Sequence, residues 1–362
     1  MRMNLIKSKD TETTTSDRYS FTVKAMAPGK VILFGEHFVV YGFPSLIASI
    51  EKFFKVTIQI PNSSNSTIKI ESNLGFTSVR QGSEIHIKPQ SLGPIFGDVV
   101  SKLYKIVDYL TNSKVILGNY SLGKSSNNND LIIKLESELP LGGGLGSSSA
   151  FCVALATSLY YLGHAYLDKN TICIQSINAE KVINVDTSGA DCNICSFGGL
   201  GTFDKVNGFK RISVNLDDFE FLVVDTGKAH DTYSIVERVS KFRKNNTNLF
   251  KDLCESYLQI YEKGITAIQK QNLQDLGYLL NQNHKLLSTL SISNPLVDKI
   301  IETCNYHGAL GTKITGAGDG GCVLSLIDRN DKMSEKILLE RLNELGLRYF
   351  FTRVDKLGLR LI

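Results

Sequence analysis

Apolar and polar residues follow two different periods along this chain. Between 131 and 138 apolar residues alternate with charged ones, which is typical of a half-buried strand. Between 98 and 110 apolar residues recur every three or four positions, which predicts a helix. Residues 147–162 are good helix formers, and we expect Gly163 to stop that helix.

The remaining patterns extend this mixture of strands and helices. Strands are predicted over 53–60 and 67–71, and the turn-forming residues 61–66 between them favour a hairpin-like connection. The second half begins near 219 and carries further segments: a strand over 219–224, helical patterns over 247–290, a strand over 323–327, a helix over 332–345 and a strand over 347–352. Strands and helices in this order predict an α+β protein with two lobes.

The length of 362 residues favours two domains rather than one. We expect a loose tail at 1–17, an N-terminal domain at 18–218 and a C-terminal domain at 219–362. The net charge of +4 is dispersed, so nucleic acid is not an expected partner. The polar tail lacks the apolar stretch of a signal peptide, and the longest apolar run, 150–162, is shorter than the roughly 20 residues that span a bilayer. We therefore expect a cytoplasmic protein without a membrane partner, and a homodimer is possible.

Seven cysteines are spread over the chain, which does not suggest the disulfide framework of a secreted protein. Cys192 and Cys195 form one CxxC pair. It could be half of a zinc site or a redox pair, or simply two partly buried thiols. The absence of a second CxxC favours the structural interpretation.

Two glycine-rich stretches compete as a phosphate site. Residues 118–125, GNYSLGKS, match the pattern G-x-x-x-x-G-K-[ST] of Walker-type nucleotidases. They are followed by Ser-Asn-Asn-Asn-Asp, a poor start for the helix that such a loop requires. Residues 139–150, LPLGGGLGSSSA, lie between a predicted strand and a predicted helix, where a backbone without side chains and a helix N-terminus can both face phosphate. A glycine-rich turn with a serine N-cap is the alternative.

Three motifs together resemble the GHMP kinases, the superfamily of galactokinase, homoserine kinase, mevalonate kinase and phosphomevalonate kinase. The first is APGKVILFGEHFVVYG at 27–42, in the form that mevalonate kinases show. The second is the loop at 140–148, and the third is KITGAGDGGC at 313–322. The motifs occur in the expected order and span most of the chain.

This resemblance implies a fold and a cofactor site. The N-terminal lobe would resemble domain 2 of ribosomal protein S5, and the C-terminal lobe would be ferredoxin-like. ATP would lie between them, with Gly316 and Gly318 of the third motif nearby. The ATP-binding residues of the second motif would be Gly142, Gly143, Gly144, Leu145, Gly146, Ser147, Ser148 and Ser149. The stretch 118–125 would then be a chance match.

The resemblance also implies roles for residues outside the glycine-rich loops. Asp191 would accept the proton of the attacking hydroxyl, and Lys30 would stabilise the alkoxide and the transferring phosphoryl group. Ser148 and Glu180 would hold Mg²⁺. The substrate would contact Glu36, His37, Ser188 and Thr232, with Thr226 as the alternative to Thr232.

The implied activity is ATP-dependent phosphorylation of a small-molecule hydroxyl, with mevalonate, giving 5-phosphomevalonate, as the first candidate. Phosphomevalonate kinase, mevalonate 3-kinase and sugar or heptose-phosphate kinases remain as alternatives within the superfamily. A Walker-type nucleotidase and a non-catalytic nucleic-acid-binding protein are alternatives from other classes.

Two departures from the family pattern leave the acceptor open. Residues 184–187 read Asn-Val-Asp-Thr where the family has His-Gly-x-Pro. Asp319 stands in the third motif where glycine is common. A carboxylate there would repel the phosphates of ATP unless it points away or meets Mg²⁺.

Overall fold

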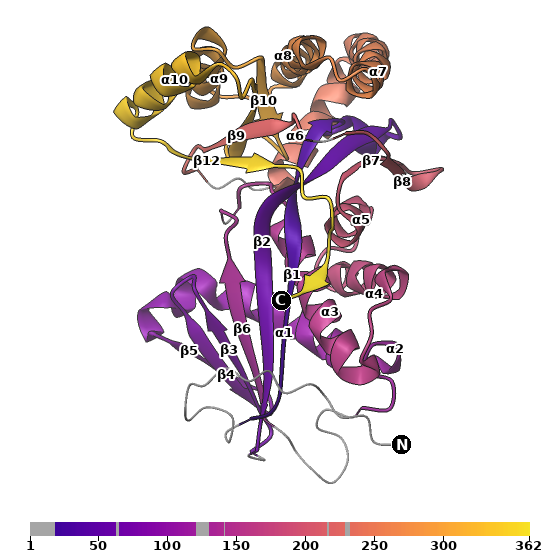
Figure 1. The fold of residues 1–362 in the computed structure, drawn as a ribbon, viewed down its shortest axis with the longest axis vertical. Helices are drawn as coiled ribbons and strands as arrows, with labels where there is room; N and C mark the ends of the chain where they lie inside the picture. The colour runs from indigo at the N-terminus through magenta and orange to yellow at the C-terminus, as the bar shows by residue number, and fades with distance from the viewer. Residues whose placement is uncertain (1–18, 63–64, 121–129, 141, 216, 229–231) are drawn as a thin grey trace.

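The computed structural model describes residues 19–62, 65–120, 130–140, 142–215, 217–228 and 232–362. The expected tail at 1–17 and the part of the 118–125 stretch from 121 onwards lie outside these residues. Within them, the strands form two sheets, one in each half of an elongated molecule (Figure 1). The predicted α+β class is confirmed, since helices pack on both sheets.

The larger sheet is built on two long antiparallel strands, β1 (Tyr19–Phe34) and β2 (Ser45–Pro61). Its order is β13-β1-β2-β6-β3-β4-β5, and β7 and β8 extend it beside β2. The other strands are β3 (Thr67–Ser72), β4 (Thr77–Gln81), β5 (Glu84–Lys88), β6 (Leu131–Ser137), β7 (Leu200–Asp204), β8 (Gly208–Ile212) and β13 (Arg360–Leu361). The predicted alternation is confirmed in β6, where Leu131, Ile133 and Leu135 are buried.

The predicted hairpin between 53–60 and 67–71 is wrong, because β6 lies between the two strands. Strand β3 pairs with β6 in parallel, with Ile70 opposite Ile133. Strand β6 pairs with β2 in antiparallel on its other side, with Ile58 opposite Ile133. Strand β6 begins 70 residues after the end of β2, and its buried apolar side chains lie between β2 and β3.

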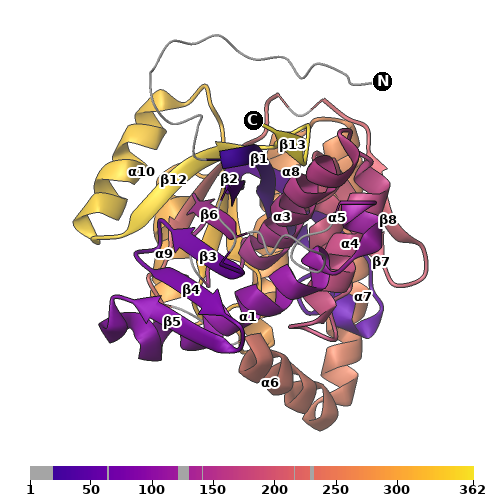
Figure 2. The same ribbon diagram turned by 90° about the horizontal axis from the view of Figure 1, so that it is seen from below.

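Helices cover one face of this sheet (Figure 2). The central one is α3 (Ser147–His164), which packs on β1 and β2 and is buried along most of its length. Around it lie α1 (Gly93–Thr111), α2 (Lys114–Leu117), α4 (Lys169–Lys181) and α5 (Ala190–Phe197). The short 3₁₀ helices η1 (Phe38–Tyr41) and η2 (Gln90–Leu92) follow β1 and β5.

Gly163 does not stop α3, which continues to His164 and ends at Ala165 with φ of 62°. The glycine is instead required by close packing. A Cβ atom at Gly163 would lie 2.6 Å from the backbone carbon of Leu117, at the end of α2. The sequence pattern therefore marked a helix crossing and not a helix end.

The second sheet has the order β10-β11-β9-β12, with antiparallel neighbours throughout. Its strands are β9 (Glu220–Asp225), β10 (Gly311–Thr315), β11 (Cys322–Ile327) and β12 (Arg348–Arg353). Its helices are α6 (Thr232–Asn245), α7 (Thr247–Gln269), α8 (Leu273–Thr289), α9 (Pro295–Tyr306) and α10 (Lys332–Glu344).

The end of the chain returns to the first sheet. Val354 forms a bridge with Ile50 of β2, and β13 pairs with β1. The two lobes are therefore joined by two stretches of chain, one before β9 and one after β12. A domain boundary at 218/219 stays a prediction. No helix in the described ranges is long and apolar enough to cross a membrane.

Candidate active site

Lys30 and Asp191 meet where the two lobes face each other. Lys30 lies on β1, and its Nζ is 3.3 Å from Asp191 Oδ2. The Lys30 side chain is 5% exposed and the Asp191 side chain 35% exposed. A buried ammonium thus holds a carboxylate that remains open to solvent on one side. This pair can accept a proton and offer positive charge at the same point.

Local structure fixes each member of this pair. Asp191 lies in the first turn of α5, directly after Gly189, which has φ of 81°. The Lys30 backbone N–H donates to the carbonyl of Leu145 over 2.9 Å. Gly146 has φ of 73°, and a Cβ atom there would lie 2.8 Å from Lys30 Cγ. The glycine therefore leaves room for the lysine side chain.

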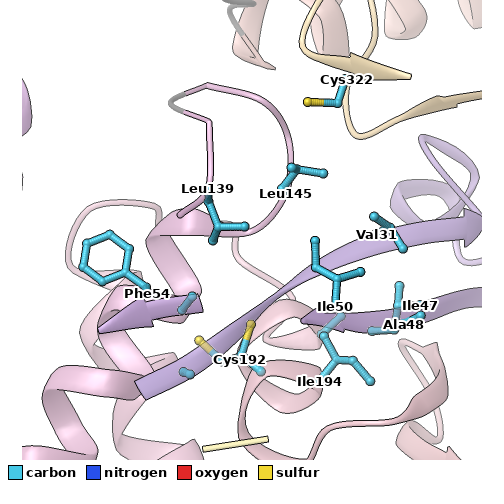
Figure 3. Close-up of a cluster of buried hydrophobic side chains, with 14 of the residues drawn as sticks. Val31, Ile47, Ala48, Ile50, Phe54, Leu139, Leu145, Cys192, Ile194 and Cys322 are labelled. Atoms are coloured by element: carbon cyan, nitrogen blue, oxygen red, sulfur yellow. The ribbon is translucent and has the colours of Figure 1, made fainter. Parts of the chain in front are cut away.

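The loop from Gly142 to Gly146 leads from β6 into the N-terminus of α3. Gly142, Gly144 and Gly146 all have positive φ, a conformation that favours glycine. Figure 3 shows Leu139 and Leu145 on the two limbs of this loop and Cys322 facing it from the other lobe. The Leu145 side chain is buried in the core, so only its backbone can serve a ligand.

The N-terminus of α3 has no side-chain cap, since Gly146 occupies the N-cap position. The first N–H groups of this 18-residue helix therefore have no side-chain acceptor, and the helix dipole adds positive potential there. The serine N-cap of the alternative interpretation is absent. Such an end is suited to an anion, phosphate above all.

Glu180 is buried behind this helix end, 6% exposed. Ser149 Oγ donates to its Oε1 over 2.6 Å, and Thr187 Oγ1 donates to its Oε2 over 2.9 Å. Burial raises the pKa of Glu180, and the nearby charge of Asp191 raises it further, whereas the two hydroxyl donors oppose the shift. The serine that hydrogen-bonds Glu180 is thus Ser149. Ser148, the serine predicted to act with Glu180, is exposed and lines the cavity described below.

Glu36 and Lys313 form an ion pair in which both side chains are fully buried. Glu36 follows β1 in one lobe and Lys313 lies on β10 in the other. Lys313 Nζ also donates to the carbonyls of Ile32 and Ile314. Burial raises the pKa of Glu36 and lowers the pKa of Lys313, and their mutual attraction opposes both shifts. The pair therefore connects the first motif to the third.

His37 makes a second contact between these motifs. Its Nε2 lies 2.7 Å from the carbonyl oxygen of Ala317. Because a carbonyl only accepts, the neutral ring carries its proton on Nε2. Burial lowers the pKa of His37, and the hydrogen bond to Ala317 partly offsets the shift.

The third motif packs against the second. Gly316 has φ of 87°, and a Cβ atom there would lie 3.0 Å from Gly144 Cα, so the two loops are nearly in backbone contact. Gly318 faces the carbonyl of Ile292 instead. Asp319 is paired with Lys228 and Arg238, so its charge is compensated by protein cations.

One cavity of about 440 Å³ collects most of the predicted site residues. The predicted site residues that line it are Lys30, Glu36, His37, all of 142–149, Glu180, Asp191, Thr232 and Gly316, and apolar neighbours complete the lining. Gly318 and Ser188 do not line it. Ser188 is exposed and its Oγ accepts from the Ala190 N–H over 3.3 Å. The alternative Thr226 is also absent from the lining, and its hydroxyl donates to the carbonyl of Gly321.

The CxxC pair lies in α5, behind the site. Cys192 and Cys195 are both buried free thiols. Burial raises the pKa of both, so little reactive thiolate forms near neutral pH. Among the described residues, no group of three or more His, Cys, Asp or Glu side chains is arranged to hold a metal ion.

Sequence reasoning missed three contributors to this site. Lys313 stands in the third motif, and its burial at a fully buried strand is a signal of a buried partner that the motif alone does not reveal. Thr187 was seen only as a departure from the pattern. The partners of Asp319 could not be found from the sequence, since they come from separate segments.

Comparisons with known proteins agree with this geometry. Residues 104–199 match the family model "GHMP kinases N terminal domain", and residues 265–346 match "GHMP kinases C terminal". A mevalonate kinase of Pyrococcus horikoshii is 30% identical over 350 residues, covering 94% of this chain and 97% of that protein.

Two solved structures have the same overall fold. The L. major mevalonate kinase in complex with R-mevalonate superposes with a TM-score of 0.75 at 24% identity, covering 96% of this chain and 99% of that chain. The Methanococcus jannaschii mevalonate kinase has a TM-score of 0.73 at 26% identity, covering 93% and 99%. This chain belongs to the GHMP kinase superfamily and is an ATP-dependent kinase with mevalonate kinases among its relatives.

Proposed function

We propose that this kinase transfers the γ-phosphoryl group of ATP to a hydroxyl of mevalonate, giving 5-phosphomevalonate. The observation that carries the proposal is the Lys30–Asp191 pair, which shares one cavity with the uncapped N-terminus of α3. A proton acceptor, a fixed positive charge and a phosphate-binding helix end are what phosphoryl transfer requires.

In this reaction the acceptor oxygen attacks the γ-phosphorus. A bond forms between them, the bond from phosphorus to the β,γ-bridging oxygen breaks, and ADP leaves with that electron pair. Asp191 takes the hydroxyl proton. Lys30, whose Nζ lies 3.3 Å from Asp191 Oδ2, stabilises the charge on the attacking oxygen and on the phosphoryl group.

Mg²⁺ fits the residues on the phosphate side. Glu180 offers a buried carboxylate that is already oriented by hydroxyl donors, and Ser148 offers a hydroxyl at the cavity wall. Mg²⁺ in kinases is usually held by one or two carboxylates together with substrate phosphates, so no larger acidic cluster is needed. The ion would neutralise charge that develops on the phosphates.

The nucleoside part of ATP would lie in a neighbouring cavity. This second cavity shares Pro140, Gly142 and Gly143 with the first and continues towards Asp225 and Arg348 of the C-terminal lobe. A nucleotide across both cavities would place its phosphates on the glycine-rich loop, with its γ-phosphate nearest to Lys30.

Mevalonate as the acceptor rests on the relatives. The Pyrococcus horikoshii protein carries the name mevalonate kinase, and the L. major enzyme was crystallised with R-mevalonate. The neutral His37 and the hydroxyl of Thr232 line the acceptor side of the cavity and can both hydrogen-bond a polar acceptor.

The test is ADP formation with Mg²⁺-ATP and single acceptors: mevalonate, 5-phosphomevalonate, galactose, homoserine and a heptose phosphate. We expect turnover with mevalonate, and product identification by phosphorus NMR should give the 5-phosphate. Turnover with another acceptor and none with mevalonate would contradict the proposed substrate and keep the kinase. A 3-phosphate product would contradict only the position of transfer.

A further inference from the structure

Asp319 occupies a backbone position suited to glycine. Its φ is 53°, in the left-handed region, where an aspartate is tolerated but glycine is favoured. Its backbone N–H donates to the carbonyl of Ile292 over 2.7 Å, so this conformation is fixed by the loop that it packs on. A side chain at this position therefore carries a conformational cost that some interaction must offset.

The carboxylate of Asp319 binds three groups from three separate segments. Lys228 Nζ, in the connection after β9, lies 3.2 Å from Oδ1. Arg238 Nη2, on α6, lies 3.0 Å from Oδ2. Asn294 Nδ2, at the N-cap of α9, donates to Oδ1 over 3.1 Å. These contacts lower the pKa of Asp319 against the opposing effect of its partial burial.

The segment that benefits most is α6. Within this helix Ile235 and Val239 are buried and Phe242 packs partly on the core, so a small apolar set holds it. Arg238 attaches it to Asp319 and, through Nη1, to the carbonyl of Ser291 over 3.2 Å. These polar contacts hold the middle of the helix, and Arg243 near its end lies over the Tyr41 ring.

The same helix forms a wall of the catalytic cavity. Thr232 and Val236 lie four residues apart, on one side of α6, and both line the cavity together with the glycine-rich loop. A shift of α6 would move both side chains together. The glycine-rich loop and Lys30 belong to the other lobe and would not follow.

We propose that Asp319 is a positioning residue for the acceptor side of the site: it fixes α6 through Arg238 and the chain ahead of α6 through Lys228, and thereby places the Thr232–Val236 wall. This proposal rests on the proposed function, which places the acceptor beside Thr232. Asp319 touches no reacting atom, and its effect is on acceptor binding rather than on phosphoryl transfer.

The decisive variant is Asp319→Gly, which suits the left-handed backbone and removes only the carboxylate. We expect the KM for the acceptor to rise about threefold to tenfold, in line with the loss of two partly exposed ion pairs. The kcat and the KM for ATP should stay within about twofold, since the parts that bind phosphate are untouched. Asp319→Asn, which keeps the shape without the charge, should give an intermediate effect.

A double-mutant cycle isolates the contact. Arg238→Met should raise the acceptor KM in the same way, and Asp319→Gly added to it should have clearly less than its single effect. If the two effects multiply fully, Asp319 does not act through Arg238 and the proposal is wrong. A rise in both KM values together with a lower Tm would show a merely structural role, and would also overturn it.

Amide hydrogen exchange of the free protein tests, without any substrate, whether Asp319 fixes α6. In Asp319→Gly, exchange in residues 233–245 should accelerate severalfold, while exchange in α3 stays as in the wild type. Unchanged protection of α6 would overturn the proposal. If the wild type phosphorylates no acceptor of the panel, the proposed function fails, and the exchange experiment still decides the role of Asp319.

Discussion

Lys30 Nζ and Asp191 Oδ2 lie 3.3 Å apart, with the lysine buried and the aspartate open to the cavity. This difference in exposure supports the proposed roles, in which the more exposed aspartate takes the hydroxyl proton and the buried lysine supplies a fixed positive charge. The pair joins β1 to the start of α5, so two rigid elements set its geometry.

Asp191→Asn should lower kcat by roughly 10²- to 10⁴-fold, the range for loss of a general base, because the amide cannot take the proton. The KM for ATP should change little. Steady-state kinetics measure both values. Asp186→Asn is the matched control, since Asp186 is exposed in the preceding loop and does not line the cavity. Full activity of Asp191→Asn would contradict its role.

The Walker-type alternative makes the opposite prediction for two lysines. If residues 118–125 bound the phosphates, Lys124→Ala would abolish turnover and Lys30→Ala would not. We expect Lys124→Ala to retain activity and Lys30→Ala to lose it. The reverse result would overturn the assignment of the phosphate site.

Gly146→Ala should impair catalysis through the neighbouring lysine. The new Cβ would lie 2.8 Å from Lys30 Cγ, and φ of 73° costs an alanine about 1–2 kcal/mol. We expect a fall in kcat larger than the change in Tm would suggest. Gly93→Ala is the control, because that glycine has a helical φ and open space around it. Equal effects of the two substitutions would argue against the contact.

Thr187→Val removes the donor to Glu180 Oε2 and keeps the shape of the side chain. Only the weaker thiol donor of Cys192, 3.5 Å away, would then remain on Oε2, so Glu180 should be held less firmly and the apparent affinity for Mg²⁺ should fall severalfold. Calorimetric titration of ADP at several Mg²⁺ concentrations measures this without turnover. Thr187→Ser keeps the hydroxyl and should behave as the wild type. If both variants bind alike, Thr187 does not orient Glu180.

Lys313→Met should destabilise the protein by about 3–5 kcal/mol, because Glu36 would be left as a buried, unpaired acid. Lys313→Met combined with Glu36→Gln should recover part of that loss. Urea unfolding measures both. Lys285→Met is the control, because Lys285 is a solvent-exposed lysine on α8. Additive losses in the double variant would show that the two side chains do not stabilise each other.

His284 should make stability depend on pH. Burial, with a smaller contribution from the charge of Lys313, lowers its pKa to about 4, although Asp298 acts in the opposite direction. Below pH 6.5, the ordinary histidine pKa, His284 is protonated in the unfolded chain but stays neutral in the folded protein. The free energy of unfolding therefore falls as pH drops from 6.5 towards about 4. A shift of this size corresponds to about 3 kcal/mol.

His284→Asn should remove that part of the slope. Unfolding free energies of wild type and variant, measured by urea titration across this pH range, should converge at the acid end. Parallel curves would mean that His284 titrates normally in the folded protein. The comparison cancels the contributions of all other titrating groups.

The sequence predicted local elements and motif order better than long-range partners. The alternation in β6 and the glycine-rich loop before α3 depend on neighbouring residues, and both appear in the structure. The predicted helix end at Gly163 is wrong because a glycine that admits a crossing helix looks in sequence like one that ends a helix. The false hairpin arose because nothing local announces that β6 will insert between β2 and β3.

The same limit applies to the site. The motifs brought out Lys30, Asp191 and Glu180, whose roles stay predictions, but not the groups that hold them. Ser149 and Thr187 bind Glu180 from two different segments. Thr187 and Asp319 both depart from the family pattern, and the contacts that they make in the folded protein explain each departure. A departure from a family pattern is informative once its partners are known.

The return of the chain end to β1 has a mechanical consequence. A body joined to its neighbour by a single connection can swing about that point, but here a second connection runs back beside β2 and ends in β13. The buried Glu36–Lys313 pair adds a third attachment between the same two bodies. These three attachments resist a hinge motion between the two halves, which a single connection would permit.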